Sequence, residues 1–391
     1  MNKNLIAKLF AFAALAMSSA ACSQDETIES VVSKTEPRKE IEFHLDVKSR
    51  ATDMTLAELD EIWVYAYDGS KAIFEATPFY KDQYGSFKPA EKIYWPEETE
   101  SITFTAFWPS PEEIKANDPF EPKIPQGTFT MNAETRKFVY QPAACSIYNY
   151  DLITATKTLN EESAANGIPL NFTHAFAQVE FKAKIDPSAE HTVEIHGCSL
   201  FSAQTRGTYS FDTKTWEPIK ETGKYMYAAP EEVLTVSEEA KSMTDKTGCL
   251  YIMPSTWNLA NFADRDESTK TGANLIVYGK VYDEENNVVY PKESDATYST
   301  RIVDSSSSKY LSDIRDITGL GKMRIQLGKG DLAIEAGHKY VFTVDFTNGV
   351  GYHAFGDKSK PMQPILNYGL KAQVTLEDWT LGSEYETVPN K

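Results

Sequence analysis

The sequence predicts an all-β protein built from antiparallel β-sandwiches. Runs rich in β-branched and aromatic residues recur along the chain, and Gly, Pro, Asn and Asp separate them. No segment of the sequence shows a sustained helical period. With 391 residues, 41% of them hydrophobic, the chain can bury sizeable cores, and we expect two sandwich domains of unequal size.

Residues 1–21 have the features of an export signal. Lys3 and Lys8 precede an apolar run over residues 9–17, which is far shorter than the ~20 residues of a membrane-spanning helix. The small residues that follow end at Cys22 and resemble a lipoprotein cleavage site, although Ser19 replaces the usual Leu. We expect a lipidated, palmitate-bearing Cys22 as the mature N-terminus. Ordinary secretory cleavage near Cys22 is the alternative.

The first predicted strand lies within residues 40–51, EIEFHLDVKSRA. Side chains alternate along a strand, so four apolar residues share one face: Ile41, Phe43, Leu45 and Val47. We expect this strand at the edge of a sandwich, with its apolar face buried. The small and polar residues around Arg50 and Ala51 predict a loop that a protease can enter.

Further strands are predicted along the rest of the chain. The clearest are Glu61–Tyr67, Ile102–Phe107, Gln178–Lys184, Leu275–Tyr278 and Lys339–Phe346. Residues 281–290 predict a hairpin with an acidic, Asn-rich turn. The polar stretch 160–167 predicts a domain boundary, which divides the mature chain into residues 51–167 and 168–391.

Charge and cysteine content exclude several classes of protein. A net charge of -18 argues against nucleic acid and anionic lipid as partners, because phosphate recognition needs clustered Lys and Arg. Once Cys22 is assigned to lipid, Cys145, Cys198 and Cys249 remain. Three widely spaced cysteines form at most one disulfide, so the stability of the fold must come from burial.

Motifs for catalysis or metal binding are absent from the sequence, and we expect no enzyme, cofactor or metal site. His191 and His196 would point to opposite faces of a strand, which disfavours joint metal ligation. The acidic stretches Asp264–Glu267 and Asp283–Asn287 lack the ligand order of a calcium loop and predict solvated turns. A hydrolase is disfavoured but not excluded.

Four tryptophans raise the question of sugar binding: Trp95, Trp108, Trp216 and Trp257. Exposed indole rings could stack on glycans, but in a chain with 12% aromatic residues we expect core packing. A monomeric surface lipoprotein that binds glycans is therefore the alternative function.

Several stretches in order resemble the fimbrillin family, the lipoprotein-precursor pilins of type V pili in Gram-negative anaerobes. The resemblance covers nearly the whole mature chain and rests on these stretches: Cys22–Glu26, Leu59–Tyr67, Ile93–Pro96, Phe104–Pro109, Asp151–Leu152, Leu170–Phe181, Gly207–Tyr209, Tyr251–Pro254 and Val374–Trp379. It implies two transthyretin-like β-sandwich domains and a structural or adhesive role in a fimbria.

The resemblance also implies a route of assembly. Residues 22–50 would be a lipidated propeptide that an arginine-specific protease removes after Arg50, leaving Ala51 as the new N-terminus. Ile41, Phe43, Leu45 and Val47 would leave with it, and a strand from another pilin subunit would fill the vacated place. The protein would sit on the cell outer membrane, surface-exposed, before processing and in the fimbrium afterwards, with a host or bacterial receptor among its partners.

The C-terminus departs from this pattern. The region 370–391 is the expected donor strand, and Leu381 and Tyr385 share one face of its tail with Ser383 and Thr387. Pro389 ends the ladder, so the tail is a poor donor. A tip or accessory subunit, or an anchor that keeps its lipid, fits this departure. A permanent first strand with Arg50 uncut is the remaining alternative.

Overall fold

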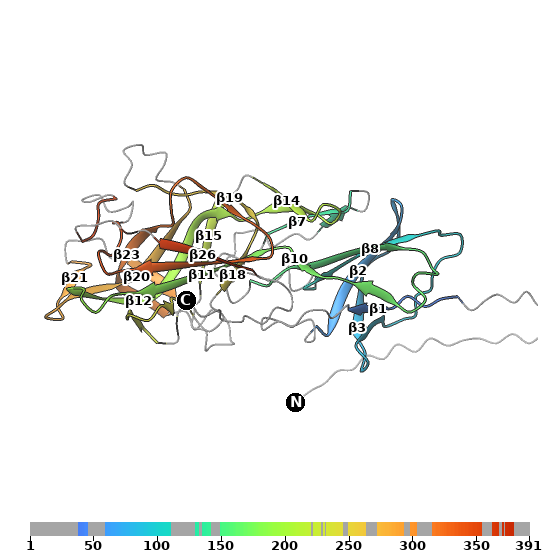
Figure 1. The fold of residues 1–391 in the computed structure, drawn as a ribbon, viewed down its shortest axis with the longest axis horizontal. Helices are drawn as coiled ribbons and strands as arrows, with labels where there is room; N and C mark the ends of the chain where they lie inside the picture. Colours follow the sequence, from blue (N-terminus) through green and yellow to red (C-terminus); the bar gives the residue numbers. More distant parts are fainter. Residues whose placement is uncertain are drawn as a thin grey trace, which may run out of the picture. The chain divides into compact units, whose positions relative to one another are not determined.

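The computed structural model describes residues 38–45, 59–110, 130–132, 135–141, 149–219, 222–227, 230, 232–244, 249–262, 272–292, 298–302, 315–353, 362–366, 370 and 372–378. These residues form strands and no helix (Figure 1), which confirms the all-β prediction. All the strands of the described part lie in one compact unit, residues 39–391. The described part of the chain holds no helix long and apolar enough to cross a membrane.

The five clearest predicted strands are all present, each extended by one or more residues or shifted by one. They are β2 (Glu61–Asp68), β5 (Ile102–Trp108), β11 (Ala177–Lys184), β20 (Asn274–Asp283) and β25 (His338–Asp345). The predicted hairpin is confirmed, because β20 pairs with β21 (Val288–Tyr290). Its turn is held by the Asp283 carboxylate, which accepts hydrogen bonds from the backbone N–H groups of Glu285 and Asn287.

The first sheet has eight strands in the order β10-β8-β5-β2-β3-β4-β1-β9. The strands not yet introduced are β1 (Phe43–Leu45), β3 (Lys71–Lys81), β4 (Ser86–Pro89), β8 (Ile153–Leu159), β9 (Ile168–Leu170) and β10 (Thr173–His174). All its pairs are antiparallel except β1 with β9. Alternate residues of these strands bury the first core, which includes Phe43, Ile62, Phe79 and Phe104.

Two further sheets enclose the second core. One has the order β17-β11-β25-β26 with β18 also on β11, and the other has β15-β12-β20-β23-β22 with β16 and β21 attached. Their remaining strands are β12 (His191–Gln204), β15 (Thr222–Met226), β16 (Leu234–Thr235), β17 (Lys241–Ser242), β18 (Cys249–Ile252), β22 (Tyr298–Ile302), β23 (Arg315–Gln326) and β26 (Ala372–Asp378). A two-stranded sheet pairs β19 (Ser255–Asn258) with β24 (Asp331–Ile334).

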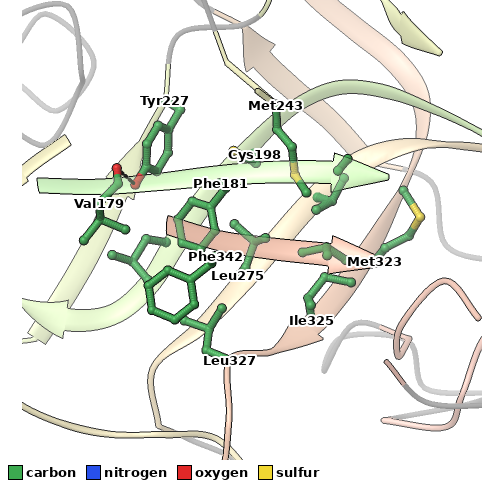
Figure 2. Packing of buried hydrophobic residues seen from close by; sticks show 14 of the residues in the cluster. Val179, Phe181, Cys198, Tyr227, Met243, Leu275, Met323, Ile325, Leu327 and Phe342 are labelled. Atoms are coloured by element: carbon green, nitrogen blue, oxygen red, sulfur yellow. Dashed lines mark hydrogen bonds between the residues drawn. The ribbon is translucent and has the colours of Figure 1, made fainter. Parts of the chain in front are cut away.

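Residues from the five-stranded and the seven-stranded sheet meet in the second core (Figure 2). The rings of Phe181 and Phe342 lie 5.3 Å apart on the parallel strands β11 and β25, and Leu275 of the other sheet belongs to the same cluster. The buried Tyr227 hydroxyl donates to the Val179 carbonyl at 3.0 Å. This face-to-face arrangement of inward side chains is that of a β-sandwich.

A four-stranded sheet joins residues that are far apart in the sequence. Its order is β14-β13-β7-β6, with β6 (Thr130–Asn132), β7 (Lys137–Tyr140), β13 (Gly207–Ser210) and β14 (Thr215–Pro218). An aromatic cluster covers it, in which Phe176 stacks on Trp216 at 5.4 Å. Strands β9 and β10 follow the predicted boundary at 167 but pair in the first sheet. The boundary and the two transthyretin-like domains stay predictions.

The tryptophans confirm the prediction of core packing. Trp95, Trp108 and Trp257 are buried, and Trp216 packs against the aromatic cluster of the four-stranded sheet. Trp95 is 3% exposed and Trp257 is 2% exposed, so neither ring offers a face to a sugar. Glycan binding therefore cannot use Trp95 or Trp257, whereas Trp216 is only partly buried.

Candidate functional site

The predicted first strand is present, but its position differs from the prediction. Strand β1 lies between two neighbours, antiparallel to β4 and parallel to β9. The expectation of an edge position was therefore wrong. The reason is β9, a strand of three residues whose parallel pairing with β1 leaves no local signal in the sequence.

Backbone hydrogen bonds extend this pairing beyond the three residues of β1. The Ile41 N–H donates to the Ile93 carbonyl at 2.8 Å, and the Trp95 N–H donates to the Lys39 carbonyl at 2.8 Å. On the other side, the Ile168 N–H donates to the Glu42 carbonyl at 2.9 Å. The segment of residues 39–45 is therefore hydrogen-bonded along both of its edges, as a strand inserted between two others would be.

The apolar face of the segment fills the first core as predicted. Ile41 is 1% exposed and Phe43 is fully buried, while Leu45 is partly buried against the same core. The Phe43 ring makes edge-to-face contacts with Phe79 at 4.8 Å and with Phe104 at 5.2 Å. Val47, Arg50, Ala51 and Cys22 lie outside the described residues.

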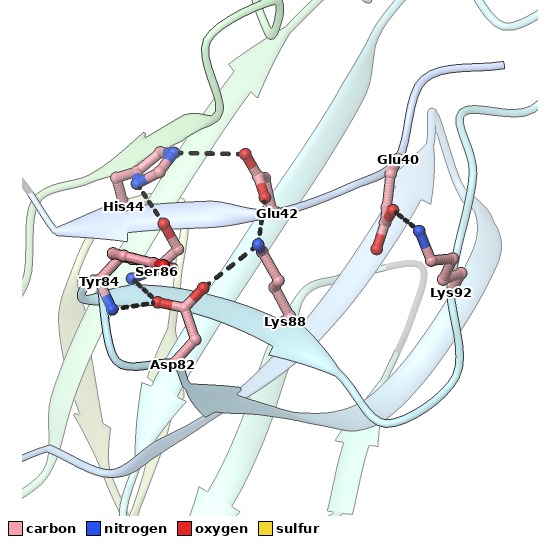
Figure 3. Close-up of polar contacts among 8 residues, drawn as sticks. All are labelled: Glu40, Glu42, His44, Asp82, Tyr84, Ser86, Lys88 and Lys92. Atoms are coloured by element: carbon pink, nitrogen blue, oxygen red, sulfur yellow. Dashed lines mark hydrogen bonds and ion pairs between the residues drawn. The ribbon is translucent and has the colours of Figure 1, made fainter. Parts of the chain in front are cut away.

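The outer face of the segment is held by charged residues of β4 and of the loop that follows it (Figure 3). Lys88 of β4 lies 3.3 Å from Glu42 and 3.2 Å from Asp82, and Lys92 lies 2.6 Å from Glu40. Hydrogen bonds to Asp82 and then to Glu42 raise the pKa of Lys88, and the bond to Glu40 raises the pKa of Lys92. These contacts fix Glu40 and Glu42 on the solvent side.

Asp82 also shapes the turn that leads into β4 (Figure 3). Its carboxylate accepts hydrogen bonds from the Tyr84 N–H at 2.8 Å and the Ser86 N–H at 3.0 Å. Desolvation raises the pKa of Asp82, but these two bonds and Lys88 outweigh it and lower the pKa overall. The carboxylate therefore positions Lys88 and the start of β4 together.

His44 anchors the end of the outer face. Its Nδ1 lies 3.0 Å from the Ser86 hydroxyl, and its Nε2 lies 3.6 Å from Glu42. Gly167, just before β9, has a φ of +87°, and a Cβ added there would lie 1.9 Å from the His44 ring. Glycine is therefore required at 167, because the backbone is left-handed there and because the His44 ring occupies the space that a side chain would need.

Sequence reasoning found the buried face of this site but missed its outer face. Lys88, Lys92 and Gly167 carry no motif, and their partners are distant in the sequence. The dipeptide Asn166-Gly167 is a turn signal and was the available hint for the glycine.

The C-terminal strand is the second feature of interest. Among the described strands, β26 pairs with β25 alone, from Ala372 opposite Val344 to Asp378 opposite His338. Four successive residues, 373–376, are exposed, which leaves Val374 at 42% and Leu376 at 55% exposure. This strand and the buried Leu370 are the described part of the predicted donor region 370–391. Leu381 and Tyr385 lie outside the described residues.

The remaining candidate residues have separate surroundings. The Nε2 atom of His191 lies 2.9 Å from the Phe346 carbonyl, whereas Nε2 of His196 lies 4.0 Å from Glu194, and burial lowers the pKa of both rings. Cys198 is buried and Cys249 is partly buried, and these two described cysteines form no disulfide with each other. Cys145 and Asp264–Glu267 lie outside the described residues. The described residues contain no group of three His, Cys, Asp or Glu side chains placed to hold a metal ion.

Comparisons with known proteins found one family model and several similar structures. A family model described as fimbrillin-like matches residues 49–379. A fimbrial protein from Bacteroides vulgatus ATCC 8482 has a similar fold, with a TM-score of 0.53 and 15% identity over 88% of this chain and 100% of that chain. The fimbrial anchor protein from Porphyromonas gingivalis matches 88% of this chain and 99% of that chain, with 13% identity and a TM-score of 0.35. No curated protein shows a significant match.

Proposed function

Because this chain belongs to the fimbrillin-like family, we propose that it is a structural or adhesive subunit of a pilus on the cell surface. Its all-β fold, shared with a fimbrial protein, supports this role. The family also agrees with the prediction that the protein is not an enzyme. Its partners would be other pilin subunits, and a surface receptor if it is adhesive.

The proposal includes assembly by exchange of the first strand. Cleavage after Arg50 would separate β1 from the rest of the chain, and a strand of another subunit would take the place between β4 and β9. The observation that carries this is the insertion of β1, a short strand bonded on both edges with Phe43 fully buried. Such a strand can be replaced by another of the same pattern through backbone hydrogen bonds and matching pockets.

Energetics argue that the vacated place would not stay empty. Burial of a large apolar side chain contributes about 1.5 to 3 kcal/mol, so loss of Ile41 and Phe43 alone removes a large part of a typical domain's 5 to 15 kcal/mol. Removal would also leave the facing edges of β4 and β9 without partners. Exposed strand edges of this kind associate with other chains.

The N-terminal part of the proposal concerns location. Lipid on Cys22 would hold the precursor on the outer membrane, and cleavage after Arg50 would release residues 51–391 from that lipid. An anchor subunit would instead keep both the lipid and its own first strand.

Mass spectrometry of the surface protein from native cells tests the processing. We expect a mature N-terminus at Ala51, and Arg50→Ala should abolish it while Arg38→Ala leaves it unchanged. A lipidated Cys22 on every molecule, in chains that retain β1, would show an uncut anchor and remove strand exchange from the role of this subunit.

A further inference from the structure

The outer face of β1 suggests which strand can replace it. Glu40, Glu42 and His44 are spaced two residues apart and alternate with the buried apolar residues Ile41 and Phe43. Each acidic residue contacts a lysine from residues 88–92 of the same polypeptide, Glu40 with Lys92 and Glu42 with Lys88. The two lysines stay with the body of the protein when residues 22–50 leave.

The lysines would respond differently to the loss of β1. Lys88 keeps its contact with Asp82, 3.2 Å away, whereas Lys92 loses the 2.6 Å contact with Glu40. The vacated place would then have one lysine without its carboxylate partner, Lys92, and a second, Lys88, still paired with Asp82, beside an apolar groove in a chain whose net charge is -18. Complementary charge speeds association and selects among strands that are equally apolar.

The groove also sets a requirement for shape. The Phe43 ring fills a pocket formed by Phe79 and Phe104, with edge-to-face contacts to both. A small side chain there would leave a void, and burial of less apolar surface would weaken binding strongly.

Resting on the proposed strand exchange, we propose that the donor strand belongs to a pilin of different sequence and not to a second copy of this chain. Four successive residues of that strand would be a carboxylate, an apolar residue, a carboxylate and an aromatic residue. Its carboxylates would pair with Lys92 and Lys88, and its aromatic side chain would enter the Phe43 pocket. The tail of a second copy fits less well. It contains Glu384-Tyr385-Glu386, but Thr387 and Ser383 are the residues available for the aromatic position.

The test uses the full chain cut after Arg50 by an arginine-specific protease and a fluorescent peptide of residues 39–48 as the probe. Fluorescence polarisation follows uptake of the probe by the cut protein. Competing probes are the same peptide with Glu40→Gln and Glu42→Gln, the same peptide with Phe43→Ala, and a peptide of residues 380–390.

We expect the peptide with Glu40→Gln and Glu42→Gln to associate more slowly than the wild-type peptide at low salt, by about two- to fivefold for each lost ion pair. The effect is modest because the pairs are partly exposed. The difference should shrink at high salt. Lys88→Gln and Lys92→Gln should remove it, and Lys71→Gln, an exposed lysine on β3, should not. The Phe43→Ala peptide and the tail peptide should bind roughly a hundredfold more weakly.

The outcomes separate the two proposals. Uptake of the wild-type peptide and the Glu→Gln peptide at equal rates would overturn the proposed pairing of donor carboxylates with Lys88 and Lys92, which is the charge rule, and would leave strand exchange intact. Binding of the tail peptide as tightly as the native peptide would overturn the assignment to a different subunit. Failure of every peptide to enter the cut protein would overturn strand exchange itself, and the charge rule with it.

Discussion

The first and last described strands of this protein differ in almost every physical respect. Strand β1 has three residues, neighbours on both sides and a fully buried ring at its first residue, Phe43. Strand β26 has seven residues, pairs with β25 alone and exposes four successive side chains. The shorter strand is therefore the more deeply embedded of the two.

This contrast separates filling a core from extending a sheet. Strand β1 completes the first core, so the body of the protein depends on whatever occupies that position. Strand β26 covers little of the second core, and its Val374 and Leu376 remain exposed. An exposed apolar strand at the end of a sheet is a natural surface for contact with another chain.

The largest expected effect comes from truncating the buried ring. We expect Phe43→Ala to lower the free energy of unfolding by about 3 to 5 kcal/mol, because it opens a cavity beside Phe79 and Phe104. Leu376→Ala, in the exposed strand, should change it by less than about 0.5 kcal/mol. Urea unfolding of the two variants measures both values, and equal effects would break the comparison.

The close approach of the His44 ring to Gly167 predicts the next largest effect. Gly167→Ala should destabilise the protein by about 2 to 4 kcal/mol, because it combines a left-handed backbone with a collision against the His44 ring. Gly85→Ala is the matched control, since Gly85 has a φ of +85° and no atom within 4 Å of the added Cβ.

A double variant isolates the steric part of that cost. Gly167→Ala combined with His44→Ala should fall toward the cost of Gly85→Ala, about 1 to 2 kcal/mol, apart from the loss of the His44 contacts themselves. Strictly additive unfolding energies would show that His44 does not pack on Gly167.

Hydrogen exchange sharpens the comparison without a mutation. The bonded amides of Ile41 and Trp95 should exchange only when the first core opens, whereas those of β26 should exchange through local fraying. Mass spectrometry of exchanged peptides from the uncut protein should therefore show faster labelling of residues 372–378. Slower labelling there than in residues 39–45 would reverse the order proposed for the two strands.

The smallest expected effect belongs to the lysines of the outer face. Lys92→Gln should reduce stability less than Gly167→Ala does, and added salt should diminish the loss. Because Glu40 raises the pKa of Lys92 above its ordinary value of 10.5, this contribution is present below that pH and is lost as the pH rises through the folded-state pKa. Unfolding midpoints at pH 8 and pH 11 should differ less for Lys92→Gln than for the parent.

Sequence patterns predicted much of this structure because they are local. Alternation predicted the buried face of Ile41 and Phe43, and β-branched, aromatic runs predicted β2, β5, β11, β20 and β25. The neighbours of β1 could not be predicted, because Phe43 pairs with Ile168 from a distant part of the chain. The charge contacts of Lys88 and Lys92 depend on the same long-range register.

The parallel pairing of β1 with β9 has a consequence for synthesis. Strand β1 is near the start of the chain, and its partner Ile168 is made only after every other strand of the sheet except β10. Contacts so distant in sequence form slowly, since the intervening chain must first be ordered. During translation, β1 can pair with β4 as soon as residues 86–89 are made, but its other edge waits for β9. A chaperone or a competing segment has access to that edge in the interval.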